Sequence, residues 1–325
     1  MIFRFIKKLL NNHKSYQNWY FETSSVNYLL DNIFSKKEFS SIKTRKLQLR
    51  KKRKWYISNI TLWEIFLTGN ENRRTELFDF SRSLFHKELM PSIEELLINY
   101  IKNGLPTIEQ RYKLKSKSIF SKHWKKACKN SLYFFEPNIN DLKTHTSYYR
   151  FLGEYFVQTN KGYVLDFDVN ISVEGKEYEM KKIENAFTNY KTKIGNEKYK
   201  KYEQHYNLSF QLVLIIFCYG INFNQEITEN YWRKIGINNP NERIDYVVKN
   251  MLELFYRGPI SNVAQMILLQ ANTNSTRGVY FDALHSAYIT YSDLYFSDDS
   301  HFESLKTIND PNMLKIRKVS EMEFS

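Results

Sequence analysis

The stretch GVYFDALHSAYITYSDLYFSDDSHF, residues 278–302, decides the fold that we expect for this chain. Apolar side chains recur at helical spacing over residues 280–291, which predicts an amphipathic helix with Asp282 in its first turn. The run 293–297 that follows is typical of a buried strand, and Asp298–Asp299 stand where that strand would end. In open α/β sheets, ligands bind outside the carboxyl ends of the strands. We therefore predict a functional site at this edge.

The first hundred residues repeat a strand-to-helix step. The predicted pairs are a strand at 19–21 with a helix through residue 33, a strand at 55–57 with a helix capped by Ser58, and a strand at 88–90 with a helix from Ser92 to Asn103. A last strand is predicted over 314–319. Alternating strands and helices predict an α/β fold with a mostly parallel sheet that is covered by helices on both faces.

Between residues 105 and 260 the alternation breaks. Residues 151–180 carry two hairpin signals, Asn160–Gly162 and Glu174–Gly175, and a mainly helical pattern follows them. We therefore divide the chain into residues 1–104, the first part of an α/β domain; residues 105–260, an inserted mixed and mainly helical lobe; and residues 261–325, the second part of that domain.

The charge of the chain favours a polyanionic partner. The 325 residues carry a formal net charge of +13 with a pI near 9.3. Bias of a genome toward Lys, Asn, Ile, Tyr and Phe codons is an alternative explanation. Ten of the nineteen residues from 36 to 54 are Lys or Arg, including the unbroken run Arg50, Lys51, Lys52, Arg53 and Lys54. That run is either a solvated face or a phosphate-binding segment. Residues 113–129 interleave lysines with aromatic residues, which either stack on and bind single-stranded nucleic acid or reflect the compositional bias.

Cysteine usage and hydropathy point to the cytoplasm. Cys128 and Cys218 are 90 residues apart, so neither a zinc motif nor a disulfide framework is indicated. The first ten residues lack the apolar core of a signal peptide. The longest apolar run, 208–221, is too short to span a bilayer, and no membrane partner is expected.

Acidic residues recur at the predicted ends of strands. Glu22 follows the first strand, Glu64 lies in the helix after the second, Asp282 begins the late helix and Asp299 ends the strand behind it. Ligands that offer only oxygen favour Mg²⁺ or Mn²⁺. Such an ion activates water and clamps phosphate oxygens, as hydrolysis of a phosphodiester requires.

Three blocks resemble, in the same order, the signature blocks of PIN-domain nucleases. They are YFETSSVNYLLD at 20–31, ISNITLWEIF at 57–66 and FDALHSAYITYSDLYFSDD at 281–299. The resemblance covers residues 17–103 and about 277–320. It implies a three-layer α/β/α domain in which Glu22, Glu64, Asp282 and Asp299 hold the metal, with Thr23 and Ser297 as supporting residues.

The chain departs from the pattern of this family in three ways. Glu22 stands where the family usually has Asp, so the geometry around a metal must adapt to a longer side chain. About 150 residues separate the third helix from the late helix, which the family usually joins directly. Asp298 and Asp293 add carboxylates that are further candidates to share or replace the role of Asp299.

The sequence therefore predicts a divalent-metal-dependent endonuclease. The resemblance implies RNA ahead of DNA as substrate, and a toxin of a toxin-antitoxin pair or an antiviral defence effector controlled by an inhibitory or regulatory protein. Two alternatives stay open. One is a catalytically inactive module that binds nucleic acid or a partner, and the other is a nuclease that acts on DNA.

Several of these residues also have a purely structural interpretation, Asp298 as a turn residue after a strand among them. Glu64 would form a capping box with Thr61 if the helix began there. Asp282 would complement a helix dipole, and Ser297 would bind the backbone of its own turn. His285, three residues after Asp282, is within reach to act as a ligand or base, but we favour a structural role for it.

Overall fold

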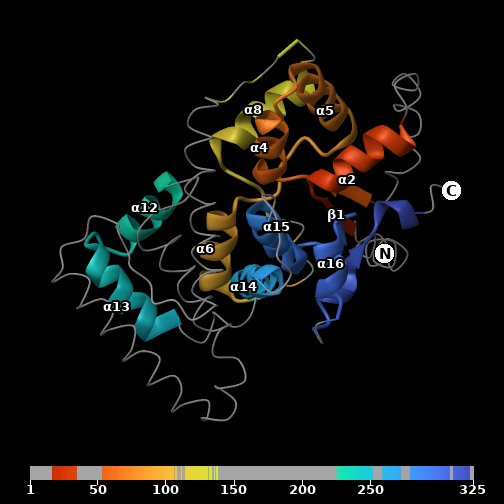
Figure 1. Cartoon of the computed structure of the whole chain (residues 1–325). Coiled ribbons are helices and arrows are strands. Elements are labelled where there is room, and N and C mark those ends of the chain that lie inside the picture. The colour runs from red at the N-terminus through yellow and green to blue at the C-terminus, as the bar shows by residue number, and fades with distance from the viewer. Residues whose placement is uncertain are drawn as a thin grey trace, which may run out of the picture. The chain divides into compact units, whose positions relative to one another are not determined.

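A computed structural model of the chain describes residues 17–34, 53–105, most of 107–137, 225–251, 258–271, 279–307 and 310–322 (Figure 1). The described residues fall into two compact units. The first unit draws on residues 1–92, 106–142 and 291–325, and the second draws on 93–105 and 143–290. The predicted division into 1–104, 105–260 and 261–325 stays a prediction.

A four-stranded parallel sheet forms the centre of the first unit. Its strands are β1 (Gln17–Phe21), β2 (Arg53–Tyr56), β3 (Leu294–Phe296) and β4 (Ile316–Arg317), and they lie in the order β2-β1-β3-β4. All three pairings are parallel, and Tyr20 of β1 is in register with both Tyr56 and Tyr295. Aromatic side chains bind neighbouring strands together, as where Phe21 stacks on Phe296 with ring centroids 4.6 Å apart. The predicted α/β class and parallel sheet are confirmed.

The strand predicted at residues 88–90 is wrong. His86 N donates to Trp55 O at 2.7 Å and Met90 N donates to Ile57 O at 3.0 Å, but the residues between them have no strand conformation. Two isolated backbone bonds attach this segment beside β2 without a ladder. The apolar run is buried at Leu89 and Met90, which explains why it resembles a strand in sequence.

Helices follow each of the first three strands in the first unit. They are α2 (Thr23–Tyr28), which continues into a π-helix η1 (Leu29–Ile33), α4 (Asn59–Leu67), α5 (Glu71–Leu84), α8 (Ile119–Lys129), α16 (Ser300–Leu305) and the 3₁₀ turns η6 (Met313–Lys315) and η7 (Val319–Glu321). Ser58 caps α4, as predicted, because its Oγ accepts from Thr61 N at 3.4 Å. Figure 1 shows α4, α5 and α8 as neighbours. The three-layer arrangement of PIN domains stays a prediction.

The described part of the second unit is helical. It holds α6 (Ile93–Asn103), α12 (Gln225–Lys234), α13 (Pro240–Met251), α14 (Gly258–Ala271), α15 (Val279–Ser286) and the 3₁₀ segment η5 (Ala287–Tyr291), whose last residue belongs to the first unit. The helix predicted to end before Gly104 does so, because Gly104 adopts a φ of +69° that favours glycine. Asn262 Nδ2 joins α14 to the end of α15 and to η5 by donating to Ser286 O at 3.3 Å and to Thr290 Oγ1 at 2.9 Å.

Several predictions concern residues outside the described part. These are the hairpins within 151–180, the apolar run 208–221 and three members of the basic run, Arg50, Lys51 and Lys52. Among the helices that the structure does describe, none combines the length and the apolar character needed to cross a membrane.

Candidate functional site

Glu22 begins the acidic edge of the sheet, directly after β1. It is the N-cap of α2, with Oε2 accepting from Ser24 N at 2.8 Å and Oε1 accepting from Ser25 N at 3.2 Å and from the Ser24 hydroxyl. Only 2% of Glu22 is exposed. The amide groups at a helix N-terminus stabilise a buried negative charge, so the local sequence Glu-Thr-Ser-Ser fixes this carboxylate at the strand end.

Glu64 reaches the same edge from α4. Thr23 Oγ1 donates to Glu64 Oε2, and Thr23 is the residue after Glu22. Glu64, 42 positions after Glu22 in the sequence, therefore accepts a hydrogen bond from the residue that follows Glu22. Because Ser58 caps α4, the capping box of Thr61 with Glu64 does not form, and that structural explanation of Glu64 is excluded. The supporting role that the resemblance implies for Thr23 stays a prediction.

The carboxyl end of β3 adjoins this group. Asp298 N donates to Ser24 Oγ at 3.1 Å, which ties the end of β3 to the start of α2. The Asp298 carboxylate accepts long bonds from Ser25 Oγ at 3.5 Å, Val319 N at 3.4 Å and Ser320 Oγ at 3.4 Å. These contacts span α2 and η7. Asp298 therefore has a structural role in holding the strand ends together.

Asp299 caps α16 and lies beside a histidine. Its Oδ1 accepts from His301 N at 2.7 Å and is 3.0 Å from His301 Nδ1. Ser297 Oγ accepts from Asp299 N at 3.1 Å, so the structural interpretation of Ser297 is observed. Asp299 and His301 each offer an atom that can ligate a metal ion. His301 lies outside the predicted set, and its place two residues after Asp299 was the available signal.

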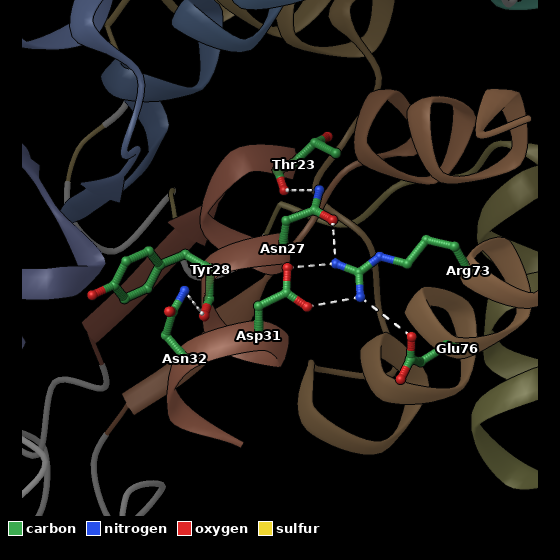
Figure 2. Close-up of polar contacts among 7 residues, drawn as sticks. All are labelled: Thr23, Asn27, Tyr28, Asp31, Asn32, Arg73 and Glu76. Carbon is green, nitrogen blue, oxygen red and sulfur yellow. Dashed lines mark hydrogen bonds and ion pairs between the residues drawn. The ribbon is translucent and has the colours of Figure 1, made fainter. Parts of the chain in front are cut away.

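A second polar network supports the helix that Glu22 caps (Figure 2). Arg73 of α5 donates to both carboxylate oxygens of Asp31, at 2.8 and 2.7 Å, and to Asn27 Oδ1 at 2.8 Å. Asn27 Nδ2 donates to Thr23 O at 3.0 Å. Burial lowers the pKa of Arg73, but hydrogen bonds and charges from Asp31 and Glu76 outweigh it, so that the pKa lies above its usual value. Figure 2 shows the guanidinium between these acids.

Asp282 belongs to the second unit. It lies in the first turn of α15, as predicted, and Gln270 Nε2 of α14 donates to its Oδ2 at 3.5 Å. His285, on the same helix, is fully buried. The assignment of Asp282 to the same site as Glu22, Glu64 and Asp299 rests on the sequence and stays a prediction.

Asp293 and the two described members of the basic run, Arg53 and Lys54, lie at the amino ends of their strands, opposite to the edge that carries Glu22. Asp293 precedes β3, where its Oδ2 accepts from Asn18 N at 2.7 Å and its Oδ1 lies 3.5 Å from Arg111 Nη1. Arg53 and Lys54 begin β2, and the Arg53 guanidinium lies 4.5 Å from the Trp19 ring centroid. The structure therefore does not bring these side chains to the edge that carries Glu22.

The donor set at the acidic edge fits a hard divalent cation. Glu22 and Asp299 follow the adjacent strands β1 and β3, Glu64 lies on the helix after β2, and magnesium and manganese prefer carboxylate oxygens as ligands. Backbone and hydroxyl donors orient Glu22 and Glu64, as ligand-orienting groups do in metal sites. We found no matching family model, curated protein or solved structure for this chain.

Proposed function

We propose that this chain is a divalent-metal-dependent endonuclease that hydrolyses phosphodiester bonds, with RNA as its first substrate and single-stranded DNA as the alternative. The observation that carries the proposal is the placement of Glu22 directly after β1, with the next residue, Thr23, donating a hydrogen bond to Glu64 on the helix after the adjacent parallel strand β2. The resemblance of three sequence blocks to PIN-domain nucleases supports the same chemistry.

In this proposal, some residues bind the metal and others orient those ligands or hold a proton. Glu22, Glu64 and Asp299 would hold Mg²⁺ or Mn²⁺, and the sequence assigns Asp282 as the fourth ligand. The bound ion supplies charge neutralisation and an activated water. Thr23 orients the Glu64 carboxylate through its hydroxyl, and the α2 amides hold the Glu22 carboxylate in place. His301, next to Asp299, is positioned to hold or move a proton at Nδ1.

A cleavage assay with labelled RNA and single-stranded DNA of one sequence tests the proposal. With Mn²⁺ present, we expect Glu64→Gln, Asp299→Asn and Asp282→Asn each to lower the cleavage rate about 100-fold or more, the order of loss when one electrostatic group is removed. Asp79→Asn is the matched control, because Asp79 lies on α5 with 44% of its side chain exposed and pairs with Arg82. Unchanged cleavage by Glu64→Gln would contradict the proposal.

A second candidate is a module that binds nucleic acid or a partner without cleaving. The favouring observation is that both Glu22 oxygens already accept hydrogen bonds from the start of α2, which gives this carboxylate a structural role without metal. Calorimetric titration with Mn²⁺ separates the two candidates. Absence of binding at millimolar Mn²⁺, together with retained RNA binding, would favour the module.

A further inference from the structure

Helix α8 carries a basic face that lies outside the acidic edge. Residues 113–129 contain seven lysines and no acidic residue. Lys122, Lys126 and Lys129 are exposed and stand at i, i+4 and i+7, so they form one stripe along the helix. The spacing therefore gathers three positive charges on one side of a single element.

The opposite face of α8 anchors the helix in the first unit. Trp124 is 1% exposed, and its Nε1 donates to His86 O at 2.9 Å. Its ring meets Phe78 of α5 edge-on, with centroids 5.9 Å apart. Because this face is buried, the lysine stripe is held facing outward.

Two neighbouring lysines of this segment pair with the carboxylate of Glu88. Lys115 and Lys125 lie 3.3 and 3.5 Å from Glu88 Oε1. Burial raises the pKa of Glu88, but the hydrogen bond from Lys115 and the charges of both lysines outweigh it, so that the pKa falls below its usual value. Among the residues that the structure describes, no carboxylate forms an ion pair with any of the three stripe lysines.

Partly exposed rings border the stripe. His123 stacks on Phe135 with centroids 4.0 Å apart and an interplanar angle of 8°, and its Nδ1 lies 2.5 Å from the Tyr133 hydroxyl. Lys126 Nζ is 5.8 Å from the Tyr133 ring centroid. The rings are also joined to α4, the helix that carries Glu64, because Phe135 meets Phe66 edge-on at 6.0 Å.

We propose that Lys122, Lys126 and Lys129, with the rings of His123 and Tyr133, form a binding surface for single-stranded nucleic acid. The lysines contact phosphates, and the rings stack on unpaired bases, which is the combination that single-strand binders use. A duplex keeps its bases stacked inside, so the rings select single strands. This inference rests on the proposed nuclease function, for which the surface supplies substrate binding.

Binding of a fluorescent 20-nucleotide uridine RNA, followed by anisotropy in EDTA at several salt concentrations, tests the surface apart from cleavage. For the triple variant Lys122→Gln, Lys126→Gln, Lys129→Gln we expect weaker binding, with the slope of log K against log salt reduced by about 2, at roughly 0.7 per lost phosphate contact. The matched control removes the same charge from exposed cations of the second unit, by Lys102→Gln, Arg233→Gln and Lys234→Gln. It should keep the original slope.

The ring contribution has its own test in the same assay. Tyr133→Ala should weaken binding roughly tenfold at an unchanged salt slope, because stacking carries no net charge. Equal affinity and slope for the triple variant and the unmodified protein, or no RNA binding at all, would overturn the inference. The inference would also be overturned if the triple variant lost binding to phosphatidylserine vesicles while it bound RNA as tightly as the unmodified protein. Reduced binding by the triple variant, with no cleavage by any protein in Mn²⁺, would refute the nuclease function and leave the surface established.

Discussion

At the scale of single residues, the charge of Lys315 conflicts with its surroundings. It lies in η6, just before β4, and burial followed by the nearby charge of Arg111 lowers its pKa to about 8. Asp293 and Asp310 oppose that shift without cancelling it. The amino end of the sheet therefore holds a lysine that ionises less readily in the folded protein than in the unfolded chain.

This shift makes stability depend on pH. Between about pH 8 and the ordinary lysine value of about 10.4, the unfolded chain binds more protons than the folded protein, so the free energy of unfolding rises with pH. We expect Lys315→Met to remove that rise, and to stabilise the protein at pH 7 by on the order of 1 kcal/mol. Urea unfolding from pH 7 to 10 measures both effects. Lys87→Met, at an exposed lysine, is the control, and an undiminished rise in Lys315→Met would contradict the assignment.

At the scale of elements, the joint between α2 and η1 is the feature that positions the acidic edge. A π-helix replaces the last turn of an ordinary helix here, and such segments are often found at functional sites. Arg73 of α5 donates hydrogen bonds to both segments, to Asn27 of α2 and to Asp31 of η1 (Figure 2). The network thus extends from α5 to Thr23, which contacts Glu64.

We expect the pair of Arg73 with Asp31 to contribute stability between elements. A double-mutant cycle of Arg73→Leu and Asp31→Asn should give a coupling of about 0.5–1 kcal/mol, because the pair is bidentate but partly solvated. Hydrogen exchange should accelerate across η1 in Arg73→Leu. In Arg82→Leu, which removes a pair within α5 alone, η1 should exchange as before. Unchanged η1 exchange in Arg73→Leu would show that the π-helix does not depend on this contact.

At the scale of the whole molecule, metal binding and folding are coupled in the proposed site. A ligand that binds only the folded protein adds about 2.7 kcal/mol of stability at a concentration of 100 Kd. We expect millimolar Mn²⁺ to raise the melting temperature, and Glu64→Gln to abolish most of that increase, while Asp79→Asn retains it. Differential scanning calorimetry with and without EDTA provides the measurement. The same Mn²⁺ shift in Glu64→Gln would place the bound ion elsewhere.

Much of the local structure was predictable because it depends on neighbouring residues. The helix after β2 begins where the sequence predicts, because Ser58 caps it from within a few residues of the amide that it binds. The absence of a strand at 88–90 was not predictable, because a buried apolar run looks the same in sequence whether or not a ladder forms. The acidic edge was predictable only as a set of strand ends.

The sequence by itself determined the alternation of strands and helices that gives a parallel sheet. It also determined the helix caps and the positions of Glu22, Glu64 and Asp299 after their strands. Tertiary structure alone decided that Thr23 donates to Glu64, that Asp298 binds the strand ends together, and that Asp293 lies at the other end of β3. The physical reason is that capping and periodicity act over one or two turns of chain. Contacts between residues 20 to 300 positions apart depend on the register in which the strands pair.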